Sequence, residues 1–220
     1  MPDAVKSTRR YDSPRRREQA AATRVDILRA AEELFAAQGY AATTMAAIAA
    51  GAGVSLKTVY VAFETKAGVL RTLWNARLRG DEGDAPIAER RPYLDVLEEP
   101  DPAAQLRLNA RNSRAGKIRL GAVIEVIRSA AAVDKDIEEL WARIGTEYLA
   151  NQRAIVESVA EKGALRPGLD IDRAADILWA INHPTVWQLL AGERGWTPEQ
   201  YEEWSAAAAC RELLTPEAVR

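Results

Sequence analysis

The segment that decides the fold is residues 44–66, which read TMAAIAAGAGVSLKTVYVAFETK. Two short runs with apolar residues at helical spacing flank a turn that contains Gly53. Thr44 can cap the first helix, and Ser55 can cap a second that reaches about Ala62, because a hydroxyl oxygen accepts hydrogen bonds from the first N–H groups of a helix. A short helix, a glycine-containing turn and a second short helix predict a helix-turn-helix, whose second helix enters the major groove of DNA.

Apolar residues on either side of this segment predict two further helices. From about Arg24 they recur at the spacing of one helix face, and Gly39 supplies a stop signal. After the second short helix, Thr65 can cap a helix that runs from Lys66 to about Arg79. The pattern predicts a three-helix DNA-binding unit followed by a linking helix.

The second helix of the motif, residues 56–62, has two faces with different chemistry. Val59 and the following Phe63 suit packing against the neighbouring helices, whereas Lys57 and Tyr60 offer a cation and a hydroxyl. Such groups meet phosphates and base edges in protein–DNA interfaces. Two plainer interpretations stay open: a glycine turn between short helices also occurs in ordinary helical proteins, and Tyr60 can belong to the core.

A longer run of residues carries a resemblance to a known family. Residues 35–45 (FAAQGYAATTM) and 48–70 (IAAGAGVSLKTVYVAFETKAGVL) resemble the N-terminal domain of the tetracycline-repressor (TetR) family of transcriptional regulators, and the resemblance covers about residues 20–75. Lys57 stands where the family often has Gly, and Val61–Ala62 stand where His or Tyr is frequent. These departures leave the base preference open.

The resemblance implies DNA contacts by the hydroxyl that opens the first short helix, by the second helix and by the lysine after it. Lys66 is expected to hold a phosphate, because backbone N–H groups at a helix start already favour an anion. Thr43 and Thr44 can instead do no more than cap a helix. The expected DNA-binding residues are Thr44, Ser55, Leu56, Lys57, Thr58, Tyr60, Val61 and Lys66.

The charge distribution is consistent with DNA at one end of the chain. Apolar residues make up 48% and charged residues 28% of the 220 residues, as in ordinary globular proteins. Up to Gly80 the chain has 13 Lys and Arg against 7 Asp and Glu, whereas beyond it the counts are 17 and 25. The basic part attracts phosphate and the acidic remainder is repelled by it.

The sequence gives little support for catalysis, metal binding or a membrane span. Cys210 is the only cysteine and His183 the only histidine, so a disulfide within the chain and a Cys/His metal site are not expected. The chain has no nucleophile elbow, no Gly-rich phosphate loop and no long apolar stretch. We expect a cytoplasmic protein that is not an enzyme and has no cofactor.

Helical patterns fill the rest of the chain and predict an all-α fold. We expect a flexible basic arm at residues 1–20, a helix-turn-helix domain at 21–66, and a ligand-binding and dimerisation domain at 67–220. The arm is either a solvated tail or a groove-binding element. The patterns beyond the linking helix cover residues 87–98, 103–114, 117–131, 134–162, 171–194 and 198–214. The last begins with a capping-box sequence at Thr197, and Pro184 predicts a kink after His183.

The C-terminal domain offers aromatic and polar residues that either form a core or line a pocket between helices. The candidate ligand-binding residues are Trp74, Leu78, Tyr93, Ile124, Trp141, Tyr148, Trp179 and Asn182. For His183, a structural role is weighed above a ligand contact.

Two apolar-faced helices near the end of the chain suggest a subunit interface. In the TetR family the last two long helices pair into a four-helix dimer contact, which the resemblance implies here; packing within one chain is the alternative. The expected interface residues are Ile177, Ile181, Tyr201, Trp204 and Ala208.

These features together predict a homodimeric, sequence-specific DNA-binding regulator, a repressor released from its operator by a small molecule. An architectural DNA-binding protein and a helical enzyme or carrier are the alternatives.

Overall fold

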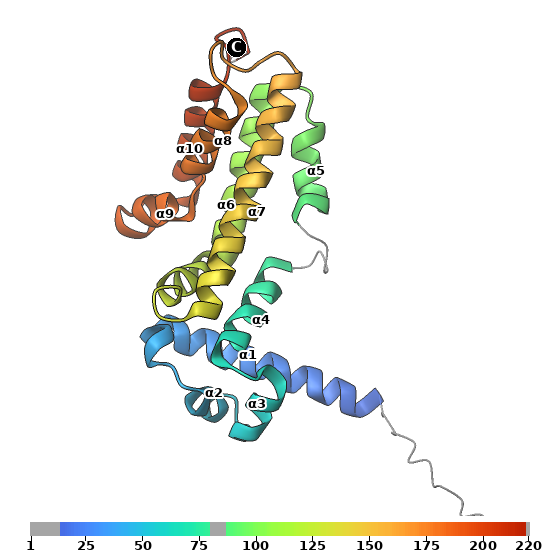
Figure 1. Ribbon diagram of the computed structural model, residues 1–220, viewed down its shortest axis with the longest axis vertical. Helices are drawn as coiled ribbons and strands as arrows, with labels where there is room; N and C mark the ends of the chain where they lie inside the picture. Colours follow the sequence, from blue (N-terminus) through green and yellow to red (C-terminus); the bar gives the residue numbers. More distant parts are fainter. Residues whose placement is uncertain (1–13, 80–86, 219–220) are drawn as a thin grey trace, which may run out of the picture. The chain divides into compact units, whose positions relative to one another are not determined.

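The computed structural model describes residues 14–79 and 87–218, and throughout these ranges the regular structure is helical (Figure 1). The prediction of an all-α fold is confirmed for them. The helices are α1 (Pro14–Ala42), α2 (Met45–Gly51), α3 (Leu56–Phe63), α4 (Lys66–Arg79), η1 (Ile87–Glu89), α5 (Arg91–Glu98), α6 (Pro102–Ala130), α7 (Lys135–Glu161), α8 (Ile171–Ile181), α9 (Pro184–Trp187), η2 (Gln188–Glu193) and α10 (Pro198–Leu213). The chain forms two compact units that divide between Leu70 and Arg71, inside α4.

Two expectations about helix extent were wrong. Residues 14–20 belong to α1 rather than to a flexible arm, because Pro14 suits the first position of a helix and Arg, Glu, Gln and Ala favour helical backbone. Residues 1–13 of that arm lie outside the described residues. The two helices expected at 103–114 and 117–131 are the single helix α6, since the modest cost of Gly116 does not end a helix held by tertiary packing.

The N-terminal unit has a small core made by the first helices. Ile27 and Phe35 of α1, Ile48 of α2 and Val59 of α3 are fully or almost fully buried. Gly39 has φ 78° and ψ 170°, a conformation that L side chains rarely adopt, and it kinks the chain inside α1. This kink turns the chain from the long first helix toward the start of α2.

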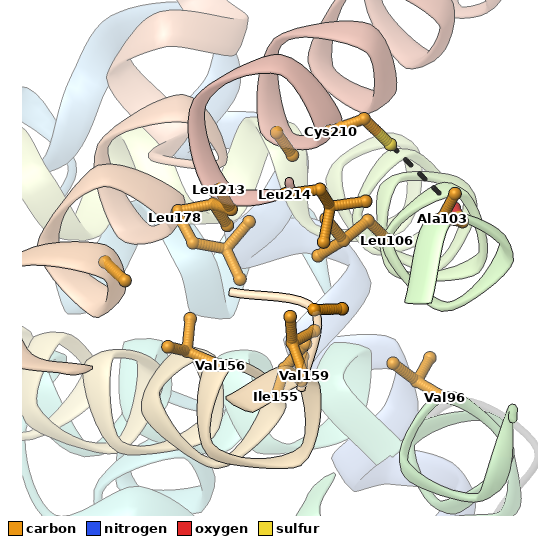
Figure 2. Packing of buried hydrophobic residues seen from close by; sticks show 13 residues of the cluster. Val96, Ala103, Leu106, Ile155, Val156, Val159, Leu178, Cys210, Leu213 and Leu214 are labelled. Carbon is orange, nitrogen blue, oxygen red and sulfur yellow. Dashed lines mark hydrogen bonds between the residues drawn. The ribbon is translucent and has the colours of Figure 1, made fainter. Parts of the chain in front are cut away.

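The core of the C-terminal unit is shared by α5, α6, α7, α8, α10 and the segments that follow α7 and α10 (Figure 2). Its buried residues are Val96, Ala103, Leu106, Ile155, Val156, Val159, Ala164, Ala174, Leu178, Ala209, Cys210, Leu213 and Leu214. The Sγ atom of Cys210 lies 3.9 Å from the carbonyl oxygen of Ala103, and burial raises the pKa of this thiol. Helices α6 and α7 run beside each other, and α10 packs along α6 (Figure 1).

The caps and the break in the C-terminal part agree with the expectations from sequence. Thr197 Oγ1 accepts a hydrogen bond from the Gln200 backbone N–H at 3.2 Å, and Gln200 Oε1 accepts one from the Thr197 N–H at 2.8 Å. Helix α8 ends at Ile181, and His183 caps α9 through Nδ1, which accepts from the Thr185 N–H at 3.2 Å. His183 therefore has a structural role at the predicted break.

In the described ranges, no single helix is both long and apolar enough to cross a membrane, although the α2–α3 pair, bent by 110°, meets the length and composition criteria jointly.

Candidate functional site

Helix α3 presents a polar and aromatic surface because its N-cap and buried residues fix its orientation. Ser55 Oγ accepts from the Thr58 backbone N–H at 3.1 Å, and the hydroxyls of these two residues are 2.8 Å apart. Val59 and Phe63 are buried, which anchors the opposite face. The residues that α3 leaves exposed are Leu56, Lys57, Tyr60 and Val61. Tyr60 and Val61 are 48% and 76% exposed, so the core interpretation of Tyr60 is wrong.

Thr44 lies exposed at the start of α2 and caps it. Its Oγ1 atom accepts a hydrogen bond from the Ala47 N–H at 3.1 Å. A hydroxyl can accept and donate at the same time. The cap that Thr44 provides is therefore compatible with donation to a phosphate.

Lys66 occupies a different place from the one expected. Its Nζ donates to the carbonyl oxygens of Tyr40 at 2.7 Å and Thr43 at 2.9 Å, and it lies 4.1 Å from the centre of the Tyr40 ring. The half-buried ammonium thus joins the start of α4 to the segment between α1 and α2. In this structure the side chain of Lys66 holds the DNA-binding unit together, because the carbonyls at the end of α1 need donors. An ammonium has three donors, so the phosphate contact expected for Lys66 stays a prediction.

Arg24 is a residue of this unit that sequence reasoning missed. Its Nη1 donates to the Ala62 carbonyl at 2.6 Å, and its guanidinium lies 4.3 Å from the centre of the Phe63 ring. A cation at the last turn of α3 is favourable because the carbonyls there carry partial negative charge. The contact joins residues 38 positions apart, so no local pattern could have indicated it.

Four of the eight predicted ligand-binding residues gather near the end of α8. The Trp179 and Trp141 rings lie 4.6 and 6.4 Å from the His183 ring, centre to centre. The Tyr148 hydroxyl donates to the Asn182 carbonyl at 2.8 Å. The other four are Trp74 and Leu78 on α4, Tyr93 on α5 and Ile124 on α6. Tyr93 serves a structural purpose, since its hydroxyl donates to the Asn151 carbonyl at 2.9 Å.

Five polar residues, which we call the buried polar cluster, surround the same helix end: Lys117, Asn182 and Tyr201 are buried, and Ser113 and Tyr148 are half-buried. Lys117 is only 8% exposed; its Nζ donates to Ser113 Oγ and lies 5.2 Å from the centre of the Tyr201 ring. Burial lowers the pKa of Lys117 to about 7 and raises the pKa values of both tyrosines. The Tyr201 hydroxyl donates to the Ile181 carbonyl at 3.1 Å.

Sequence reasoning missed Lys117, Ser113 and the polar part played by Tyr201. A lysine in a helix is ordinarily solvent-exposed, and its burial here depends on the packing of α6 against α7 and α10. Asn109 and Gln152 continue the polar contacts: Gln152 Oε1 accepts from Asn109 at 3.2 Å and from Asn182 at 3.3 Å.

A groove of about 610 Å³ lies elsewhere, between α6 and α10. It is lined by Arg107, Arg111, Arg114, Glu199, Glu202, Glu203, Ala206, Ala207, Cys210 and Arg211. Arg114 pairs with Glu199 at 2.6 Å and with Glu202 at 2.7 Å, so charges across the groove are matched. None of the predicted ligand-binding residues lines it.

The predicted dimer residues differ in accessibility. Ile177, Ile181 and Trp204 are half-buried. Tyr201 and Ala208 are 0% and 4% exposed within the single chain, so their assignment to a subunit interface is corrected. The apolar spacing of α10 identified a packing face, and α6 and α8 already cover that face.

Within the described part of the chain, no group of three or more His, Cys, Asp and Glu residues is placed to hold a metal ion.

Comparison with known proteins places this architecture among bacterial regulators. The family model for bacterial regulatory proteins of the tetR family matches residues 27–73, which include α2, α3 and the start of α4. The chain is 28% identical to the probable HTH-type transcriptional regulator ArpR of Pseudomonas putida over 181 residues, which cover 80% of this chain and 85% of ArpR.

Solved structures show the same fold over both units. NalD, the secondary repressor of the MexAB-OprM multidrug efflux pump in Pseudomonas aeruginosa, has a TM-score of 0.67 at 22% identity, covering 90% of this chain and 99% of NalD. SmeT, the repressor of the Stenotrophomonas maltophilia efflux pump SmeDEF, has a TM-score of 0.64 at 21% identity in its complex with triclosan, covering 90% of this chain and 94% of SmeT.

Proposed function

This chain belongs to the tetR family of bacterial regulatory proteins, and from that premise we propose that it is a homodimeric transcriptional repressor that a small molecule releases from its operator. The chain is a DNA-binding transcriptional regulator; dimerisation, the sense of regulation and the effector are the proposal. It acts in the cytoplasm, where bacterial DNA lies, and neither catalysis nor a cofactor forms part of this function.

The exposed face of α3 is the observation that carries the proposal. An aromatic ring, an apolar side chain and a cation stand outward on one short helix, at Tyr60, Val61 and Lys57. Exposed apolar side chains at such a surface suit contact with a partner, and the thymine methyl and the phosphates offer matching groups. The hydroxyl groups of Thr44, Ser55 and Thr58 lie at the starts of α2 and α3. The backbone N–H groups at a helix start favour a phosphate there.

Release by a small molecule is supported by the chemistry of the C-terminal unit. Its buried polar cluster lies in a helical bundle, where ligand sites are frequently built. SmeT, which shares the fold, was solved with triclosan bound. Because α4 belongs to both units, displacement of its C-terminal half by a ligand would move the half that begins at Lys66.

Selection of bound sequences from random double-stranded DNA tests the proposed function. Two copies of α3 related by a two-fold axis must meet successive major grooves, so the selected sites should be palindromic with half-sites about one helical turn, or a small multiple, apart. Sites without two-fold symmetry would contradict the dimer, and the absence of any sequence preference would contradict a specific regulator.

Lys57→Ala is expected to change base preference at one or two positions of each half-site. Lys57 is exposed on α3 and is held by no contact that the fold needs, so its loss removes a donor to base acceptors without disturbing the helix. A panel of single-base operator variants measures the effect, which should be about 1–3 kcal/mol at the affected position. Lys135→Ala, at the exposed start of α7, is the matched control. An unchanged preference would remove Lys57 from the base-contacting set.

Ile177→Glu is expected to shift the dimer toward monomers. Ile177 is half-buried on α8, and a carboxylate placed against an apolar partner surface costs several kcal/mol if it stays unpaired. Mass measurement at micromolar concentration reads the change, with Val133→Glu at a 69% exposed position as the control. A monomeric unmodified chain, or an Ile177→Glu dimer of unchanged affinity, would place the interface elsewhere or remove it.

A further inference from the structure

The buried polar cluster contains a cation without a counter-ion. In the described part of the chain no carboxylate pairs with Lys117, and its contacts are a hydroxyl and an aromatic ring. Lys117 faces the hydroxyl of Ser113 on its own helix and the ring of Tyr201 on α10, and its charge acts on His183. Tyr148 on α7 lies beside Ser113. A buried charge without a partner lowers the stability of the fold. Proteins keep such charges mostly at binding or catalytic sites.

Two polar atoms, one in the cluster and one beside it, also lack hydrogen-bond partners. The indole Nε1 of Trp179 and the side-chain carbonyl Oδ1 of Asn182 are buried and form no hydrogen bond. Asn182 is only 2% exposed. A buried donor, a buried acceptor and a buried cation around one helix end are complementary to a molecule with an anionic group and further polar groups.

The segment that covers this region is weakly anchored. Over α9 and η2, residues Pro184–Glu193, no side chain is fully buried, and six of these residues form a π-helical turn. π-Helical turns are uncommon and occur frequently at functional sites. Trp187 of this segment meets the Tyr201 ring edge-on at 5.0 Å, and the break at His183 separates the segment from α8. Outward movement of the α9–η2 segment would break the Trp187–Tyr201 contact and half-buried packing, but it would expose no fully buried side chain of the segment itself.

We propose that Lys117 anchors an effector that carries a carboxylate on an apolar body, and that movement of the α9–η2 segment admits this effector to the buried polar cluster. The inference rests on the proposed ligand-responsive function and names the chemical class of its ligand. The carboxylate accepts from the Lys117 ammonium, and Trp187 and Tyr201 supply apolar contact for the body. A hydroxyl or amine on the effector would supply the donor that Asn182 Oδ1 lacks.

Matched acids and amides test this assignment on the full-length chain. The probes are 1-naphthoate, 4-phenylbutyrate and decanoate, each beside its primary amide, with dissociation constants measured by titration calorimetry. At least one acid should bind about 10-fold or more tightly than its amide, because only the acid pairs with the buried cation. Lys117→Met should abolish this preference while amide affinity stays within about 3-fold, and Lys117→Arg should retain it in part.

Each remaining outcome overturns the carboxylate assignment. The assignment is wrong if acids and amides bind alike, if the preference for acids survives Lys117→Met, or if no acid in the panel binds. Operator DNA is titrated in parallel to separate this inference from the proposed function. Neutral molecules that lower operator affinity equally in the wild type and in Lys117→Met would preserve the function while removing Lys117 from it. If the preference for acids depends on Lys117 but the chain selects no operator, the carboxylate assignment stands and the proposed function is contradicted.

Discussion

Lys117→Met is expected to raise the free energy of unfolding of the C-terminal unit by about 3–5 kcal/mol at pH 6, or roughly 10 °C in Tm. The reason is that burial lowers the pKa of Lys117 from 10.5 to about 7 in the folded chain. The folded state therefore bears the cost of a buried ammonium at low pH, whereas methionine fills a similar volume without a charge.

The pH dependence of this gain identifies its cause. Between pH 7 and pH 10.5 the unfolded chain binds the Lys117 proton and the folded chain does not. The free energy of unfolding of the wild type therefore rises with pH over this interval. The advantage of Lys117→Met is complete below pH 7 and is largely lost by pH 9.5. Tyr148 and Tyr201, which share the cluster, have raised pKa values and stay neutral over this range. Burial lowers the pKa of His183, and the positive charge of Lys117 lowers it further.

Thermal unfolding of the two chains at pH 6 and pH 9.5 provides the measurement. Lys135→Met, which removes an exposed lysine of α7, should leave Tm nearly unchanged at both values. A stability gain that does not depend on pH would mean that packing, and not the buried charge, is responsible.

Lys66→Met is expected to destabilise the N-terminal unit by about 2–3 kcal/mol, since hydrogen bonds to charged groups contribute about 1.5–3 kcal/mol each and this lysine is only half-buried. The Thr43 carbonyl, whose own side chain is buried, would lose the Lys66 ammonium as a hydrogen-bond donor. The Tyr40 ring would lose the same ammonium from beside it. Operator affinity should fall for all sequences alike.

The salt dependence of operator binding distinguishes this structural role from a phosphate contact. Loss of a phosphate contact would lower the slope of log K against log salt by about 0.9, whereas loss of a structural tie leaves the slope as it was. We expect an unchanged slope, together with faster hydrogen exchange at residues 40–48. Lys66→Arg, which keeps the charge, should recover part of the stability. A reduced slope at wild-type stability would instead support the phosphate contact by Lys66.

The parts of the structure that follow from local chemistry were predictable from the sequence. The caps at Thr44, Ser55 and Thr197 each depend on a residue three positions away, and the kink at His183 depends on the next residue. The helical period likewise identified the apolar faces. These signals are contained in a short window of sequence, so no knowledge of the tertiary fold was needed.

The parts that depend on distant contacts were not predictable. The period of α10 identified Tyr201 and Ala208 as apolar-face residues, but it could not tell a partner subunit from α6 of the same chain. Lys66 and Arg24 bind carbonyls 23 to 38 positions away, and Lys117 is buried by helices that lie far along the chain. A lysine that looks solvated in a helical pattern is thus the residue on which the effector hypothesis depends.

Cys210, buried against Ala103, makes the natural chain convenient for spectroscopy. Thiol reagents attack the thiolate, so the raised pKa and the burial of this side chain protect it from labelling. A cysteine placed at Val61, which is 76% exposed on α3, would then take up a spin label selectively without prior removal of the native thiol. In a homodimer the two labels would mark the two recognition helices, and the distance between them, with and without effector, would report directly whether the ligand changes their spacing.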